Sequence, residues 1–135
     1  MSPSTSALLG YIIWMLALLF TLASVRVGLV MTGKKAPNSF APDGTDVSPF
    51  VNRLCRAHAN CYESFPIFGG LLLLAIATSN NSITDGLAYY FIGARVLQSL
   101  TQLASSSNIA VNVRFAFFII QVLIAVSWVI AFIKL

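Results

Sequence analysis

The sequence predicts an all-α integral membrane protein, a four-helix bundle with up-down topology. Hydrophobic residues make up 58% of the 135 residues and charged residues only 9%, and the mean hydropathy is +0.85. These values exceed those of an ordinary soluble domain. Several uncharged runs are also long enough to cross a hydrocarbon core of roughly 30 Å, which takes about 20 helical residues. We therefore expect one transmembrane domain over residues 1–135 and no soluble domain.

We expect membrane spans at approximately residues 7–31, 51–79, 84–104 and 111–133. The third is the least apolar because Arg95 interrupts it, and this charge must face protein or water. Ser48 and Pro49 are typical of the N-cap and first residue of a helix, so they predict where the second helix begins. Pro66 lies inside that helix and predicts a kink just past Glu63.

The loops indicate how the bundle is oriented. We expect a polar loop at 32–47, a tight connection at Asn80–Ser82 that also leaves Asp85 in the second loop, and a third connection at 105–108. Basic residues gather in or beside the first and third loops: Lys34, Lys35, Arg53, Arg56 and Arg114. By the positive-inside rule these two loops should be cytoplasmic and both termini should lie on the opposite side.

The net charge of +4 fits this topology and contact with anionic headgroups. Nucleic acid is not an expected partner, because the chain has no basic run with interleaved aromatic residues. Cys55 and Cys61 are six residues apart on one helix and point in different directions, so they should not pair. With one histidine and no cysteine pair at ligand spacing, we expect no metal site.

Two predicted helices carry polar stripes. Arg53, Arg56, Asn60 and Glu63 fall within an arc of about 80° on the second helix. Arg95, Gln98, Ser99 and Gln102 follow an i, i+3, i+4, i+7 pattern on the third. Since the two helices are antiparallel, Glu63 and Arg95 reach similar depths, and an ion pair between them would satisfy both.

The stripes leave an excess of positive charge. One carboxylate cannot neutralise Arg56, Arg95 and Arg114, and Arg26 adds another cation at shallower depth. Polar groups in lipid often do no more than join helices. The surplus charge favours a pocket for a small anionic, peptide-like or phosphate-bearing ligand, beside a lipophilic substrate that enters from the bilayer.

The segment Arg56–Pro66, RAHANCYESFP, resembles the second-helix signature of the MAPEG family, the membrane-associated proteins in eicosanoid and glutathione metabolism. Gly93–Leu97 resembles the family's third-helix segment around its arginine, and Arg26-Val27 a basic position late in its first helix. The resemblance implies a homotrimer that binds glutathione between neighbouring subunits, in a bent conformation, toward the cytoplasmic side.

The resemblance also implies roles for single residues. Arg56, Asn60 and Glu63 match glutathione-binding positions, and Arg95 matches an arginine that is structural or lines the site. Arg114 is the candidate catalytic residue, a cation that stabilises the glutathione thiolate. Further candidates for glutathione binding are Arg53, Gln98, Gln102, Arg26 and His58, of which His58 points away from Arg56 and would contact ligand from a neighbouring chain or remain an interfacial polar residue. Ser64, Gln98 and Gln102 stand where some members have tyrosine or histidine, so phenol contacts to the ligand are lost.

The predicted function is that of a glutathione-dependent transferase or peroxidase acting on lipophilic electrophiles. One alternative is a non-catalytic MAPEG-like protein that binds glutathione or lipid, which the two glutamines favour. Another is a small proton-coupled multidrug transporter that uses Glu63 as its membrane carboxylate. Arg56 and Arg95 disfavour transport, because a carboxylate that binds and releases cations should not lie beside two arginines.

Overall fold

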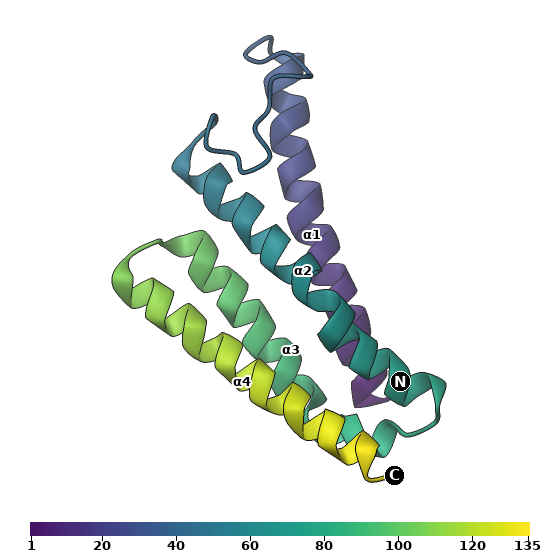
Figure 1. Ribbon diagram of the computed structural model, residues 1–135. Helices are drawn as coiled ribbons and strands as arrows, with labels where there is room; N and C mark the ends of the chain where they lie inside the picture. The colour runs from purple at the N-terminus through teal and green to yellow at the C-terminus, as the bar shows by residue number, and fades with distance from the viewer.

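The computed structural model describes all 135 residues, and they form four helices (Figure 1). These are α1 (Pro3–Met31), α2 (Pro49–Ala77), α3 (Asn81–Ala104) and α4 (Asn108–Ile133). Helices α1, α2 and α4 are long and apolar enough to cross a membrane, whereas α3 has 24 residues and a more polar composition. The predicted all-α, four-helix class is confirmed. Each helix begins a few residues before the span expected from the sequence.

Serine caps start three of the helices. The side chains of Ser2, Ser48 and Ser107 each accept a hydrogen bond from a backbone N–H in the first turn, at 3.1 to 3.2 Å. Such a cap satisfies one of the amides that a helix start leaves unpaired. The Ser48-Pro49 start of α2 is therefore confirmed. Helix α2 stays continuous across Pro66.

Helices α1 and α2 end in the same way, with one residue in the left-handed region. In α1 that residue is Gly33, at φ +72°, and the Lys34 N–H bonds to the Leu29 carbonyl at 2.9 Å. In α2 it is Ser79, at φ 57°, and the next N–H bonds to the Ala75 carbonyl at 2.8 Å. Both ends are Schellman motifs, but only glycine adopts this conformation without a steric cost.

The second connection lies two residues earlier than the expected Asn80–Ser82, and Asp85 does not lie in it. The turn spans Thr78–Asn80, and α3 already begins at Asn81. The Asp85 carboxylate, inside α3, accepts hydrogen bonds from the Ser4 N–H at 3.1 Å and the Ser4 hydroxyl at 2.6 Å. Because free amides and a partial positive charge gather at a helix start, the carboxylate stabilises the beginning of α1. It also fastens α1 to α3 beside the chain termini.

The helices form two antiparallel hairpins, α1–α2 and α3–α4. Figure 1 shows both termini at one end of the bundle and the two hairpins diverging toward the other end, where the 32–48 loop and the α3–α4 connection lie. Helix α4 packs mainly on α3 and meets α2 over only a short stretch. The divergence leaves room between α2 and α4 on the loop side of the bundle.

An aromatic cluster joins the hairpins nearer the terminal end of the bundle than the loop end. The Phe91 ring lies 6.0 Å from the Tyr11 ring, 5.1 Å from Phe68 and 5.7 Å from Trp128, so all four helices contribute. The Tyr11 hydroxyl donates to the Cys61 carbonyl at 2.6 Å. A buried phenol needs such a partner, and this bond fixes how α1 and α2 lie against each other.

The 32–48 loop folds back onto the start of α2. The Lys35 ammonium lies 2.8 Å from the Asp46 carboxylate, which also accepts from the Ala41 N–H. These two donors hold the pKa of Asp46 below its usual range. The Asn52 side chain donates to the Asp43 carbonyl at 2.8 Å and ties the loop to α2.

Both cysteines are buried and free, as expected. The Cys61 thiol lies 3.3 Å from the Ser99 hydroxyl and joins α2 to α3. Large aliphatic and aromatic side chains cover the outer faces of the helices, among them Phe20, Ile67, Tyr90 and Leu123. Apolar side chains on the outside and polar ones inside are what a bilayer requires.

The two helix ends allow a matched test of backbone strain. Ser79→Gly should raise the free energy of unfolding by about 1 kcal/mol, because glycine removes the steric cost at positive φ. Gly33→Ser should lower it by a similar amount, since an added Cβ there meets no atom within 4 Å and only the backbone conformation is penalised. Thermal unfolding in detergent measures both. Shifts of the same sign would contradict the strain assigned to Ser79.

Candidate functional site

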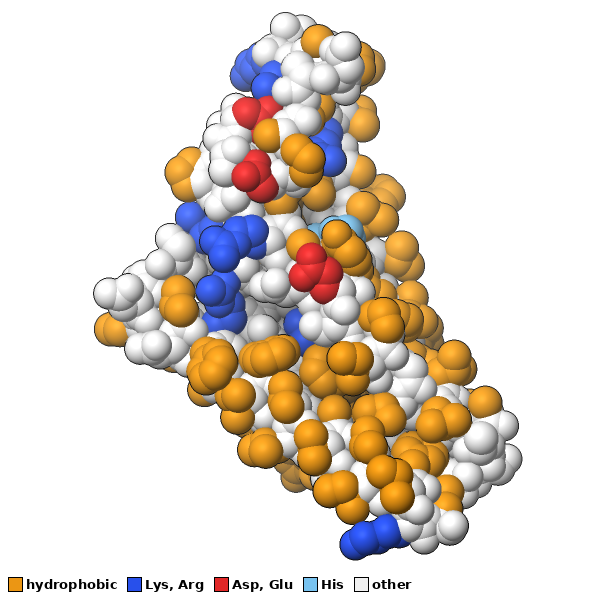
Figure 2. Space-filling view, in the orientation of Figure 1, with side chains coloured by type: hydrophobic (Ala, Val, Ile, Leu, Met, Phe, Trp, Pro, Cys, Tyr) orange, Lys and Arg blue, Asp and Glu red, His pale blue; other side chains and the backbone are white.

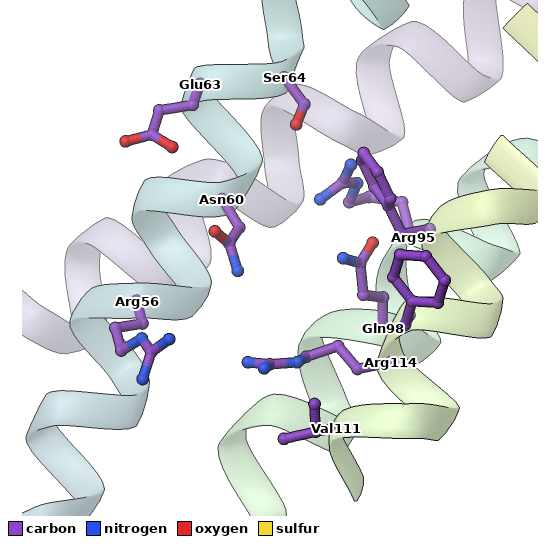
Figure 3. Close-up of a pocket in the computed structure, with 10 residues that line it drawn as sticks. Arg56, Asn60, Glu63, Ser64, Arg95, Gln98, Val111 and Arg114 are labelled. Carbon is purple, nitrogen blue, oxygen red and sulfur yellow. The ribbon is translucent and has the colours of Figure 1, made fainter. Parts of the chain in front are cut away.

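A cavity of about 400 Å³ lies between α2 and the α3–α4 hairpin. Figure 3 shows its polar side chains converging from three helices. They are Arg56, Asn60, Glu63 and Ser64 from α2, Arg95 and Gln98 from α3, and Arg114 from α4. Val111, Phe115 and Phe118 form an apolar wall on α4. Six of the ten residues predicted for the site therefore line one cavity.

Arg95 is the most deeply buried charge in the cavity wall. Its side chain is 1% exposed, and its guanidinium carbon lies 5.6 Å from the Tyr11 ring centre and 5.5 Å from that of Phe68. Aromatic faces attract a cation, but they supply no hydrogen-bond acceptor in the plane of the guanidinium. The Nε and Nη2 atoms of Arg95 have no partner. A buried donor without a partner is costly, so this side chain lacks an anion.

The ion pair predicted between Glu63 and Arg95 does not form. The one salt bridge in the structure joins Lys35 to Asp46. Glu63 is exposed at the rim of the cavity, and in Figure 3 its carboxylate points away from Arg95. The depth argument placed the two residues at similar heights, but Arg95 instead enters the aromatic cluster behind the cavity.

The polar stripe predicted on the third helix lies inside the bundle. Arg95, Gln98, Ser99 and Gln102 are all buried. The Asn60 amide donates to the Gln102 side-chain oxygen at 2.8 Å, and the Gln121 amide of α4 donates to the Gln98 oxygen at 2.8 Å. These bonds connect α3 to α2 on one side and to α4 on the other.

A second cavity of about 340 Å³ adjoins the first near the α3–α4 connection. The two share Arg56, Val111 and Arg114, and the second adds Arg53 and Gln102. The Arg53 Nε donates to the Leu103 carbonyl at 2.9 Å, near the end of α3 where carbonyls lack helical partners. Arg53 thus belongs to the mouth of the site, not to its interior.

Arg26 and His58 line neither cavity. The Arg26 guanidinium lies 3.9 Å from the Cys55 thiol and 5.7 Å from the Phe40 ring centre, on the side of α2 that faces α1. The His58 ring lies 5.3 Å from that of Tyr62. The structure therefore does not bring these two predicted site residues together with the others within one chain.

An apolar groove of about 370 Å³ continues from the first cavity along α2 and α4. Ser64 and Phe118 lie on both, and Glu63 marks the boundary. The groove is lined mainly by aliphatic side chains such as Ile67, Val122 and Val126. A lipophilic molecule in the groove would therefore touch the contents of the cationic cavity.

The charged side chains around the two cavities are mostly positive. Figure 2 shows lysine and arginine side chains gathered where the hairpins diverge, with hydrophobic side chains covering the half of the face nearer the C-terminus. The two cavities hold four arginines and a single carboxylate, Glu63. Fixed cations around a concave, partly dry surface attract an anionic ligand.

Sequence reasoning missed Gln121, which is fully buried in α4. It is the one amide in the largely apolar run Phe115–Ile133 and lies seven residues after Arg114, so both face the same side of the helix. Phe118, between them, was also missed, because an aromatic residue in an apolar run carries no signal that distinguishes it from a lipid-facing one. An isolated amide in a membrane helix is a functional candidate for the same reason as Arg95, because burying a polar group in the bilayer is costly, and this signal is present in the sequence.

The family model of the MAPEG family matches residues 5–134, nearly the whole chain. The chain belongs to the MAPEG family. No curated protein and no solved structure matches it. The resemblance inferred from the Arg56–Pro66 segment is thereby confirmed.

Membership makes the chain an integral, multi-pass membrane protein with the MAPEG fold, in a family linked to glutathione and eicosanoid metabolism. Its motif residues lie where the fold forms a cavity: Arg56, Asn60 and Glu63 follow one another along the same side of α2. In this MAPEG chain a polar cavity and an apolar groove meet within one subunit.

The unpaired state of Arg95 gives a stability prediction. Arg95→Met should raise the free energy of unfolding of the ligand-free protein by about 1 kcal/mol or more, because methionine fills the same space without a buried, uncompensated charge. The control is Arg53→Met, which should lower stability because it removes the bond to the Leu103 carbonyl. Thermal unfolding in detergent measures both. A large loss in Arg95→Met would show that the cation–aromatic contacts alone explain the arginine.

Proposed function

We propose that this protein binds glutathione in the cationic cavity and uses it to conjugate or reduce lipophilic electrophiles, as a glutathione transferase or peroxidase. The observation that carries the proposal is the buried Arg95 guanidinium, which lacks an anion. Two more arginines line the same cavity. Family membership supports glutathione as that anion, because the MAPEG family is linked to glutathione metabolism.

The residues present fit the chemistry of glutathione. It carries two carboxylates, one ammonium group, two peptide units and a thiol. Arg56 and Arg95 suit the carboxylates, because guanidinium and carboxylate form paired, charge-assisted hydrogen bonds. Glu63 suits the ammonium, and the Asn60 amide suits a peptide unit. A cavity of about 400 Å³ is within the size range of small-ligand sites.

Arg114 is the residue proposed to activate the thiol. Figure 3 shows its guanidinium extending from α4 into the space between the helices. A nearby cation lowers the pKa of a thiol from about 8.5, so that more thiolate is present at neutral pH. Bound glutathione supplies that thiolate as the nucleophile. The wall formed by Phe115 and Phe118 limits water around it, which strengthens the interaction with the arginine.

The groove between α2 and α4 is proposed to admit the electrophile from the bilayer. Its aliphatic lining suits a lipophilic molecule, and it meets the cavity at Ser64 and Phe118. Polar glutathione would enter from water through the mouth near Arg53, where the second cavity opens. The two reactants therefore need not share one route.

We further propose a homotrimer in which neighbouring subunits complete each site. Arg26 and His58 lie outside the cavity of their own chain, and Glu63 is exposed at its rim. Membrane lipid would surround the trimer. The bias of basic residues supports cytoplasmic 32–48 and 105–107 loops and termini on the opposite side.

The first test is glutathione binding to the purified protein, together with the ultraviolet absorbance of the bound thiolate. Wild type should bind glutathione and show thiolate at neutral pH. Arg114→Ala should retain binding and lose the thiolate signal, because the pKa of the bound thiol returns toward about 8.5. The matched control is Arg53→Ala, which removes an arginine from the mouth and should leave the thiolate signal intact.

The other outcomes would each indicate a different function. Binding without thiolate in wild type would indicate a non-catalytic glutathione-binding or lipid-binding protein. No binding at millimolar glutathione would overturn the proposal and turn attention to proton-coupled transport, which Glu63→Gln would abolish.

A further inference from the structure

Gln121 lies behind the cavity and not in its wall. It is fully buried in α4, and its Nε2 lies 2.8 Å from the Gln98 side-chain oxygen and 2.9 Å from the Phe117 carbonyl oxygen. Gln98 itself lines the cavity, between Arg95 and Arg114 (Figure 3). Gln121 therefore touches the site only through Gln98.

The directions of these hydrogen bonds follow from one backbone group. A carbonyl oxygen accepts and never donates, so the Phe117 carbonyl requires the NH₂ group of Gln121 to face it. The same NH₂ group then provides the second hydrogen toward Gln98. Gln98 must meet that donor with its oxygen, and its own NH₂ group is left to face the cavity.

This arrangement leaves the buried oxygen of Gln121 without a partner, and the buried Nε and Nη2 of Arg95 have none either. Unpaired buried groups are uncommon because each is costly. Here they accompany a wall that presents only donors, from Arg95, Gln98 and Arg114. Across the cavity, the Asn60 amide gives its hydrogen to Gln102, so its oxygen remains available on α2 beside the Glu63 carboxylate. Both walls carry cations, since Arg56 lies on α2, but only the α2 wall also presents acceptors.

We propose that Gln121 is a positioning residue: through the Phe117 carbonyl it locks the Gln98 amide with its N–H donors in the cavity, and so makes the α3–α4 wall select an anionic group of the ligand. This inference rests on the proposed function for its ligand. It assigns to the α3–α4 wall the anionic end of a zwitterionic, peptide-like thiol, and to the α2 rim the ammonium end.

The test reverses the direction of one hydrogen bond. In Gln121→Glu the carboxyl supplies at most one hydrogen in place of the two that the amide gives to Gln98 and the Phe117 carbonyl. When the carboxyl is ionised, or when its O–H donates to the Phe117 carbonyl, an oxygen faces Gln98, which then offers its NH₂ group and turns its own oxygen into the cavity. The dissociation constant for glutathione should rise roughly tenfold or more, because a charge-assisted hydrogen bond is replaced by a repulsive contact. Gln121→Met keeps the volume and frees Gln98, so it should cause a smaller loss. Ser99→Ala, which removes another buried contact of α3 outside the cavity, should bind as wild type does.

A double-mutant comparison separates positioning from packing. Gln98→Leu and the double variant Gln98→Leu with Gln121→Glu should bind glutathione equally, because Gln121 then has no amide to orient. Losses that add in the double variant would overturn the inference, as would unchanged binding in Gln121→Glu. If Gln121→Glu does not fold, Gln121→Met and its double variant provide the same comparison.

Failure of the proposed function remains distinguishable. If wild type does not bind glutathione, sulfate is the probe, and its effect on thermal unfolding is compared between wild type and Gln121→Glu. Stabilisation of wild type alone would retain the positioning role and reject glutathione as the ligand. Equal stabilisation, or none in either protein, would reject the positioning role too.

Discussion

A guanidinium buried in an apolar bundle without a counter-ion is the constraint on which the rest of this structure depends. Arg95 lies between the rings of Tyr11 and Phe68, which relieve part of the cost of burying its charge. The hydroxyl of Tyr11 is in turn fixed by the Cys61 carbonyl. Supporting one cation therefore requires α1, α2 and α3 to meet at a defined height, and two of its donors remain buried without a partner behind the cavity.

The two hairpins contribute differently to that space. Helix α2 contributes the motif residues and the one carboxylate, whereas α3 and α4 contribute hydrogen-bond donors. One of these donors, the Gln98 amide, is held by its hydrogen bond to Gln121. Because α4 touches α2 only briefly, the polar cavity lies between them on the loop side and the apolar groove continues from it toward the terminal end. The polar cavity and the apolar groove thus meet at a boundary formed by Glu63, Ser64 and Phe118.

The sequence predicted the helices and most of the cavity because both follow from spacing on a helix. Arg56, Asn60 and Glu63 recur with helical periodicity, and so do Arg95 and Gln98, so membership of a common face could be foreseen. The way in which the helices pack against one another could not be foreseen. Depth arguments paired Glu63 with Arg95, but the rotation of each helix about its axis, which packing decides, turned Arg95 toward aromatic rings.

The same limit explains two smaller errors. Asp85 was read as part of a loop, because nothing local indicates that its partner is the first turn of α1, some 80 residues earlier in the chain. Gln121 is recognisable from sequence as an isolated amide, but its partner Gln98 lies on another helix and is not. Residues whose partners lie on another helix can be recognised as unusual from sequence alone, but their partners cannot be named.

The hydrogen bonds between Asp85 and Ser4 fasten the bundle at its terminal end, and the two hairpins diverge toward the other end. A helix of 29 residues is about 43 Å long at 1.5 Å per residue. If the bundle were fastened at the terminal end alone, a change of one degree in the angle between hairpins would displace the loop end by roughly 0.8 Å, given that length. The hydrogen bonds from Arg53 to the Leu103 carbonyl and from Asn60 to Gln102 join α2 to α3 near the loop end and oppose this displacement. The width of the cavity therefore depends on these two side-chain bonds as well as on the contacts at the terminal end.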